Sequence, residues 1–200
     1  DFSFQRFSET YLDSFIEHVK EAKVIERFDA IYSGEQANTT ENRPVDHFGY
    51  RKENSAREQS VLDEQEKALV LSEHINKQEY EAIIFFGIGG SQLGPELIQQ
   101  TLCYNKHKKI VFITGSDPLE AEFKTKGLNL DACAFILASK SFSTIETLKS
   151  FELVTQKAHM QNTYAITSNI VGAEAFGVSR KNILTFSEAT GGRFSIWSPI

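Results

Sequence analysis

From residue 80 onward, short apolar runs alternate with segments of helical periodicity, and this alternation limits the possible folds more than any other feature of the sequence. The early runs are apolar without interruption, as is typical of strands that are covered on both faces. The segments between the runs are long enough for the crossover helices that join parallel strands. The pattern therefore predicts an α/β fold with a three-layer, doubly wound, five-stranded parallel sheet. The expected strands are 82–86, 110–114, 134–138, 164–167 and 182–186, and the expected helices between them are 95–104, 118–126 and 144–159.

The residues before this alternation predict a helical N-terminal arm. Apolar side chains between Phe4 and Ala22 recur at steps of three and four, which places them on one face of a helix. Residues 34–46 are rich in Gly, Asn, Thr and Pro and lack apolar periodicity, so we expect a loop there. A second helical pattern covers about 58–75. The sequence thus predicts two domains, a helical arm over 1–79 and an α/β domain over 80–200.

Composition and charge exclude several classes of function. The 200 residues carry 27 acidic and 21 basic side chains, and 40% of them are hydrophobic, which is ordinary for a soluble globular domain. The basic cluster at 106–109 is too short to form a surface for nucleic acid or for an anionic membrane. No apolar run is long enough to span a bilayer. We therefore expect neither nucleic acid nor membrane as a partner.

The cysteines and histidines point to no metal or disulfide chemistry. Cys103 and Cys133 form neither a CxxC motif nor a disulfide framework, so we expect a reducing, cytoplasmic environment. The five histidines are scattered and match no metal-ligand spacing, and most of them are expected at the surface or on helix faces. The chain begins at Asp1 rather than Met and stops after an apolar, Gly-rich stretch, which suggests a piece of a longer protein.

A glycine-rich loop, GIGGSQLGP at 87–95, is expected to follow the first strand, at the edge where such sheets bind ligands. Its glycines let the backbone approach a ligand, free N–H groups at a helix start favour an anion, and Ser91 adds a hydroxyl. Pro95 suits the first turn of the next helix. The loop fails the Walker pattern and matches the dinucleotide fingerprint only in part, with Asp117 as the candidate ribose-binding acid. A plain strand-to-helix turn is the other alternative.

A hydroxyl-rich loop over 138–144 is expected to follow the third strand. Four hydroxyl groups and the Lys140 ammonium lie within six residues, which is a dense set of donors for a phosphate. Thr144 and Thr147 also fit an ordinary N-cap arrangement, so a capped helix beside a solvated lysine is the alternative. In one common doubly wound order the first and third strands are neighbours, and both loops would then converge on one anion. The pair of loops therefore favours an anion site.

These loops resemble the phosphoglucose isomerase family when they are taken together with an arginine that follows two glycines, Gly191-Gly192-Arg193. That arginine has little side-chain bulk around it and could meet an anionic substrate or intermediate. The matching segments follow the family's order from about residue 40 to the end. They are GIGGSQLGP at 87–95, ASKSFSTIET at 138–147, TSN at 167–169 and TGGRFSIWSPI at 190–200, with a further similar segment at 40–47.

The resemblance implies a cytoplasmic homodimer without metal or cofactor that interconverts glucose 6-phosphate and fructose 6-phosphate in glycolysis and gluconeogenesis. Residues 80–200 would form the first of two sugar-isomerase (SIS) domains. In the family's reaction the sugar ring opens, and a glutamate base moves a proton between C2 and C1 through a cis-enediolate. The motif of that base would lie beyond residue 200. Carried over by motif position, Gly90, Ser91, Ser139, Lys140, Ser141 and Thr144 would hold the substrate phosphate, and Arg193, with Gly192 beside it, would stabilise the enediolate.

The sequence departs from the family's pattern at some positions. Gln92 stands where many members have Asp, and Glu188-Ala189-Thr190 replaces a common Asp-Trp-Val before Gly191, as expected of a divergent member. Two other functions remain open at this point. A non-catalytic SIS module would bind a sugar phosphate without turnover, and a nucleotide-dependent dehydrogenase would bind NAD.

Overall fold

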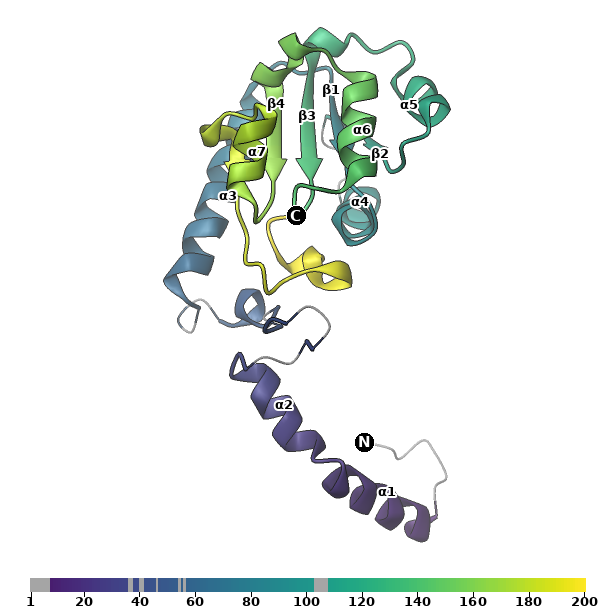
Figure 1. Ribbon diagram of the computed structural model, residues 1–200, viewed down its shortest axis with the longest axis vertical. Coiled ribbons are helices and arrows are strands. Elements are labelled where there is room, and N and C mark those ends of the chain that lie inside the picture. The colour runs from purple at the N-terminus through teal and green to yellow at the C-terminus, as the bar shows by residue number, and fades with distance from the viewer. Residues whose placement is uncertain are drawn as a thin grey trace. The chain divides into compact units, whose positions relative to one another are not determined.

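The computed structural model describes residues 8–35, 38–39, 42–45, 47–53, 55, 57–102 and 108–200, with the backbone alone at Arg193 (Figure 1). The chain divides into two compact units, 1–46 and 47–200. The sheet and the loops that follow its strands all lie in the second unit. The domain boundary expected at residue 79 stays a prediction.

The first unit consists mainly of two helices, α1 (Glu9–Glu21) and α2 (Val24–Tyr32). Ser8 caps α1, because its Oγ accepts a hydrogen bond of 3.2 Å from the Tyr11 N–H. Neither helix contains a buried residue. Within the expected loop, Asn38 and Arg43 form an antiparallel bridge. The predicted helical periodicity is confirmed for α1, whereas Phe4 lies outside the described residues.

The second unit contains a five-stranded sheet in which every pair of neighbouring strands is parallel, in the order β2-β1-β3-β4-β5. The predicted fold class is therefore confirmed. The arrows of β3 and β4 in Figure 1 point toward the yellow C-terminal segment. Because every neighbouring pair of strands is parallel, the carboxyl ends of all five strands share this edge of the sheet. The strands are β1 (Ala82–Phe86), β2 (Lys109–Ile113), β3 (Cys133–Ala138), β4 (Thr163–Ile166) and β5 (Ile183–Leu184).

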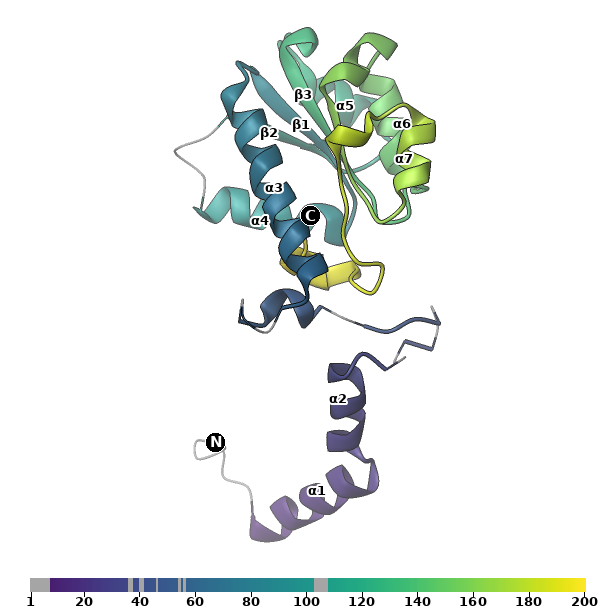
Figure 2. The same ribbon diagram turned by 90° about the vertical axis from the view of Figure 1, so that its left-hand side faces the viewer.

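Helices cover both faces of the sheet, because alternate side chains of each strand are apolar on both sides. On one face, Phe86 and Phe135 pack edge-on against Phe151 of α6 (Ile145–Val154). On the other face, Ile75 of α3 (Gln59–Lys77) packs in a cluster with Ile83. Figure 2 shows α3 on one side of the sheet and α6 and α7 on the other. The described residues also contain the helices α4 (Gly90–Leu102), α5 (Pro118–Thr125) and α7 (Ile170–Phe176). Short 3-10 helices among them are η1 (Gly49–Arg51), η3 (Leu130–Ala132), η4 (Lys157–Asn162), η5 (Arg180–Asn182) and η6 (Gly192–Trp197).

Most predicted elements differ from the observed ones by one or two residues at an end, and the differences at three of them have a clear structural reason. α4 begins at Gly90 rather than at Pro95, because the glycine-rich loop itself winds into the first helical turn. The helix expected over 144–159 ends at Val154 and is followed by η4. The last strand, β5, is only two residues long. Asn182, which precedes it, belongs to η5, and the side-chain amide of Asn182 donates to the Thr163 carbonyl oxygen at 3.0 Å.

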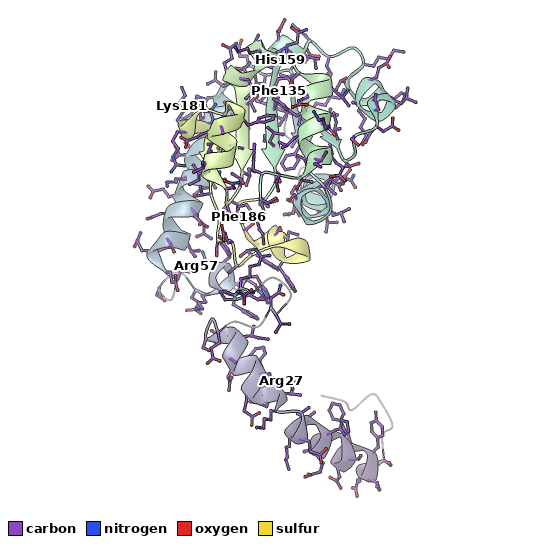
Figure 3. The ribbon with its side chains drawn as sticks, in the orientation of Figure 1. Arg27, Arg57, Phe135, His159, Lys181 and Phe186 are labelled. Atoms are coloured by element: carbon purple, nitrogen blue, oxygen red, sulfur yellow. The ribbon has the colours of Figure 1, made fainter. Side chains whose placement is uncertain are left out.

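His159 is one of the buried polar residues, in contrast to the surface or helix-face position expected for most histidines. Its Nδ1 accepts from the Gln156 N–H at 3.0 Å, so Nε2 carries the proton and donates to Asp131 Oδ1 at 3.0 Å. The ring stacks on Phe135 at a centroid distance of 5.2 Å (Figure 3). Because His159 precedes β4, it lies at the amino edge of the sheet, opposite the glycine-rich and hydroxyl-rich loops.

Cys133 opens β3 and is fully buried, and this burial raises the pKa of its thiol. Its Sγ also donates to the Asn129 carbonyl oxygen at 3.3 Å. Because the thiolate is the nucleophilic form, we expect Cys133 to resist iodoacetamide at mildly alkaline pH in the folded protein and to react in concentrated urea. Peptide-resolved mass spectrometry measures both rates. Equal rates in the two solutions would contradict this assignment of an inert, structural thiol.

Candidate functional site

The glycine-rich loop leaves β1 at the carboxyl edge of the sheet and turns directly into α4. Gly89 has a φ of +56°, a left-handed conformation that glycine adopts without steric cost. Its carbonyl oxygen accepts from the N–H groups of Gln92 and Leu93 at 3.1 and 2.8 Å. The Ser91 N–H donates to the Ile88 carbonyl oxygen at 3.1 Å. The N–H groups of Ser91, Gln92 and Leu93 are thus used within the turn. The loop's contribution to an anion site therefore rests on the backbone at the start of α4, the Ser91 hydroxyl and the helix dipole.

The backbone of Gly90 lies against the backbone of Gly192, which opens η6. A Cβ atom added at Gly90 would stand 1.9 Å from the Gly192 carbonyl oxygen, so only glycine fits there. One turn later, a Cβ at Gly94 would stand 3.1 Å from the Cβ of Ile196. α4 and η6 therefore dock through small residues at two successive turns. This docking brings the glycine-rich loop and the segment around Arg193 together.

The hydroxyl-rich loop leaves β3, the strand that is hydrogen-bonded to β1. Ser139 is buried, and its Oγ forms a hydrogen bond of 3.0 Å with Thr144 Oγ1 across the loop. Ser143 Oγ donates to Ser141 Oγ at 2.7 Å. Phe142 has a φ of +50°, which is unfavourable for a bulky side chain, and its ring is buried against Phe176 at a centroid distance of 5.7 Å. Burial of this ring holds the loop in a compact, left-handed turn.

Lys140 links the hydroxyl-rich loop to the glycine pair before Arg193. Its Nζ donates to the Glu188 carbonyl oxygen at 3.1 Å. The same Nζ lies over Gly191, where an added Cβ would stand 2.8 Å from it. The ammonium group therefore stands at the junction of the two segments, close to the Gly90–Gly192 contact.

The structure thus brings together three of the sequence-predicted residues, Gly90, Lys140 and Gly192. Ser139 and Thr144 are bonded to each other in the same loop as Lys140, and Ser141 is exposed beside them. Ser91 is half-buried on the first turn of α4, directly after Gly90. The backbone of Arg193 belongs to η6, and its side chain lies outside the described atoms.

Asp117, the candidate ribose-binding acid of the nucleotide alternative, has a structural role. Asp117 caps α5, because its Oδ1 accepts from the Leu119 N–H at 2.9 Å. This is an ordinary helix-start role, and nothing in it requires a ribose. Gln92, the other departure noted in the sequence, is buried in α4, and its amide donates to the Glu96 carboxylate.

Sequence reasoning missed the residues that support η6 and the segment before it. The Tyr50 hydroxyl accepts from the Ser187 N–H at 3.2 Å and donates to Glu64 Oε2 of α3 at 2.5 Å. Burial raises the pKa of Glu64. The ring of His47 stacks on Phe194 at a centroid distance of 4.1 Å. Nothing in the local sequence marks these contacts, because each joins positions that are far apart in the chain.

A second missed group is the turn at 167–169, which follows β4. The sequence shows its resemblance to the family but assigns it no role. Its hydroxyl and amide groups bond to the backbone of the hydroxyl-rich loop. The run of Thr, Ser and Asn at the end of a predicted strand was the sequence feature from which this role could have been inferred.

Among the described residues, no three His, Cys, Asp or Glu side chains are grouped closely enough to hold a metal ion. In the same part of the chain, none of the helices combines the length and apolar character needed to cross a lipid bilayer.

Comparison with known proteins gives a consistent result. A family model described as phosphoglucose isomerase matches residues 1–200. Proteins named glucose-6-phosphate isomerase from Christiangramia forsetii, Saccharophagus degradans and Shewanella baltica are 29%, 30% and 31% identical over the whole chain. The chain spans 41% of the length of the first two of these relatives and 42% of the third.

Two solved structures share the fold. A glucose-6-phosphate isomerase from Chlamydia trachomatis matches with a TM-score of 0.76 and 23% identity, over 97% of this chain and 41% of the other. A hypothetical protein from Thermus thermophilus matches with a TM-score of 0.60 and 18% identity, over 97% of this chain and 46% of the other. At these identities the structural match supports the α/β architecture alone.

Proposed function

The chain belongs to the phosphoglucose isomerase family, and on that premise we propose that it supplies the phosphate-binding loops and the intermediate-stabilising arginine of an aldose–ketose isomerase. The reaction is the reversible conversion of glucose 6-phosphate and fructose 6-phosphate. The observation that carries the proposal is the junction at the carboxyl edge of the sheet, where Gly90 meets Gly192 and the Lys140 ammonium lies over Gly191.

The proposed phosphate site combines charge with short hydroxyl groups. Lys140 supplies a positive charge next to the loop that carries Ser139, Ser141 and Thr144. A phosphate has several acceptor oxygens, and charge-assisted hydrogen bonds to them are stronger than neutral ones. Ser91 adds a hydroxyl from the start of α4, and Gly90 keeps the backbone there free of side-chain bulk. The phosphate is thereby anchored away from the carbons that react, which orients the sugar for proton transfer.

Arg193 is proposed to face the sugar rather than the phosphate. Proton transfer between C2 and C1 creates an enediolate, whose negative charge exists only along the reaction path. A cation placed at that charge lowers the barrier, because it binds the transition state more strongly than the ground state. Gly192, beside it, lets η6 dock on α4 and so fixes where the Arg193 backbone lies.

We assign the general base to the part of the relatives' length that this chain does not span, and not to Glu146 or Glu188. The complete protein is proposed to be a cytoplasmic homodimer of glycolysis and gluconeogenesis, built on SIS domains and working without metal or cofactor. Neither nucleic acid nor membrane is proposed as a partner.

Replacing Lys140 with alanine in the complete protein tests the phosphate anchor. We expect the KM for fructose 6-phosphate to rise about tenfold with kcat changed much less, because a hydrogen bond to a charged group contributes about 1.5–3 kcal/mol. An assay that couples glucose 6-phosphate formation to NADP reduction measures both constants. Lys181→Ala is the matched control, since this lysine is exposed in η5 at the amino edge of the sheet (Figure 3).

Two outcomes would overturn parts of this proposal. An unchanged KM in Lys140→Ala would remove Lys140 from the phosphate site. A wild-type protein that binds the sugar phosphate without turnover would be a sensor instead of an enzyme. Arg193 would then have no enediolate to stabilise, and its proposed role would be wrong.

A further inference from the structure

The hydroxyl-rich loop is held by the turn that leaves β4, over 167–169. Three donors converge on the Lys140 carbonyl oxygen: Thr167 Oγ1 at 2.9 Å, Ser168 Oγ at 2.8 Å and the Ser168 N–H at 3.1 Å. A carbonyl oxygen has two lone pairs, so three donors on one oxygen saturate it. Such a carbonyl is fixed in direction, and the peptide that follows Lys140 is fixed with it.

The next carbonyl in the loop is held as well. Asn169 Nδ2 donates to the Ser141 carbonyl oxygen at 2.9 Å. The other end of the same amide accepts from the Gly172 N–H at 2.9 Å, so the cap of α7 sets its orientation. Thr167, which is fully buried, also accepts from the Asn169 N–H at 3.0 Å. The three side chains of the turn therefore form one connected network.

The direction of these carbonyls decides which way the loop presents its donors. A trans peptide places its N–H opposite its carbonyl. With the Lys140 carbonyl held against the β4 turn, the Ser141 N–H points away from that turn. The side chains of Lys140 and Ser141 branch from the same fixed peptide. The Lys140 ammonium then reaches Glu188 and Gly191 on the other side.

We propose that Thr167, Ser168 and Asn169 are positioning residues, which hold the main chain of Lys140 and Ser141 so that this loop binds the substrate phosphate in one orientation. The inference rests on the proposed function, because it concerns the same phosphate site. None of the three side chains needs to touch the substrate. They act through the two carbonyls, and their removal loosens the loop rather than removing a ligand.

The test uses Ser168→Ala and Asn169→Ser in the complete protein, singly and together. Serine at 169 keeps an oxygen that can cap α7 but is too short to reach the Ser141 carbonyl. We expect each change to raise the KM for fructose 6-phosphate about threefold, and the pair about tenfold, as the loss of hydrogen bonds of ordinary strength implies. kcat should stay within about twofold, because the groups that stabilise the transition state are untouched. Ser179→Ala, an exposed serine at the amino edge of the sheet, is the matched control.

Titration calorimetry with inorganic phosphate separates this inference from the isomerase assignment. We expect the phosphate dissociation constant to rise by the same factors as KM, with a thermal midpoint close to that of the control. A lower thermal midpoint with unchanged KM and unchanged phosphate affinity would show a merely structural role and overturn the inference. If the wild-type protein binds phosphate but does not isomerise sugar phosphates, weaker binding in the variants supports the positioning role while the proposed function fails. If the wild-type protein isomerises sugar phosphates but binds no inorganic phosphate, the inference fails while the isomerase assignment stands.

Discussion

Replacing Arg193 with alanine in the complete protein is expected to lower kcat by about 10²–10³-fold, equivalent to about 2.7–4 kcal/mol of transition-state stabilisation. KM should change little, because the guanidinium is proposed to face a charge that exists only along the reaction path. The site around Arg193 is suited to this role by its backbone: Gly191 and Gly192 precede it, and the η6 segment that carries it docks on α4. The coupled assay with fructose 6-phosphate measures the effect.

Two further variants make this result specific. Arg193→Lys keeps the positive charge but not the planar, forked donors, so its kcat should lie between those of the wild type and the alanine variant. Arg180→Ala removes an exposed arginine of η5 and should leave kcat unchanged. A kcat in Arg193→Ala within a few-fold of the Arg180→Ala value would exclude Arg193 from the chemistry.

Gly90→Ala is expected to be the most damaging change among the glycines of the site. The new Cβ would stand 1.9 Å from the Gly192 carbonyl oxygen, which is backbone and cannot rotate away. α4 and η6 must then separate, and Arg193 moves with η6. Because a displacement of about 1 Å can cost about 10²-fold in rate, we expect kcat/KM to fall by at least about that factor. Steady-state kinetics and a thermal unfolding curve on the same preparation measure the effect.

Gly127→Ala is the matched control for this substitution. Gly127 has a φ of +80° and no atom within 4 Å of an added Cβ, so alanine there introduces backbone strain without a clash. Left-handed backbone costs a non-glycine residue about 1–2 kcal/mol, which should lower the thermal midpoint and leave kcat/KM unchanged. Wild-type kcat/KM in Gly90→Ala would mean that the Gly90–Gly192 contact is not needed in the working site.

The architecture could be predicted from the sequence because the strands are buried on both faces. β1, with five apolar residues in succession, is recognisable without any knowledge of its neighbours. The boundary of α4 could not be predicted in the same way. Pro95 favours a helix start, but Gly89 turns the chain early and its carbonyl accepts the first helical bonds. The preference of Pro95 for the first turn of a helix therefore did not set the helix start, because Gly89 adopts a left-handed conformation that glycine allows readily.

The candidate site was predictable as a set of loops but not as a geometry. Residues such as Lys140 and Gly90 stand out by type and spacing, whereas the contacts that arrange them depend on tertiary approach. Phe142 shows why: its left-handed backbone is unfavourable locally, and burial of its ring against Phe176 compensates. The hydrogen bonds from Ser168 to the Lys140 carbonyl could not be predicted from the sequence either, because every residue has a backbone carbonyl.

The contact between Gly90 and Gly192 also bears on the order in which the molecule folds. These residues are separated by half of the chain, and every strand after β1 lies between them. Closing so long a loop before the strands have paired would cost chain entropy without a compensating gain. The sheet is therefore expected to form first, and the docking of η6 on α4 to be a late event in folding. A chain emerging from the ribosome would then have its hydroxyl-rich loop, the proposed phosphate anchor, in place before the segment that carries Arg193 docks.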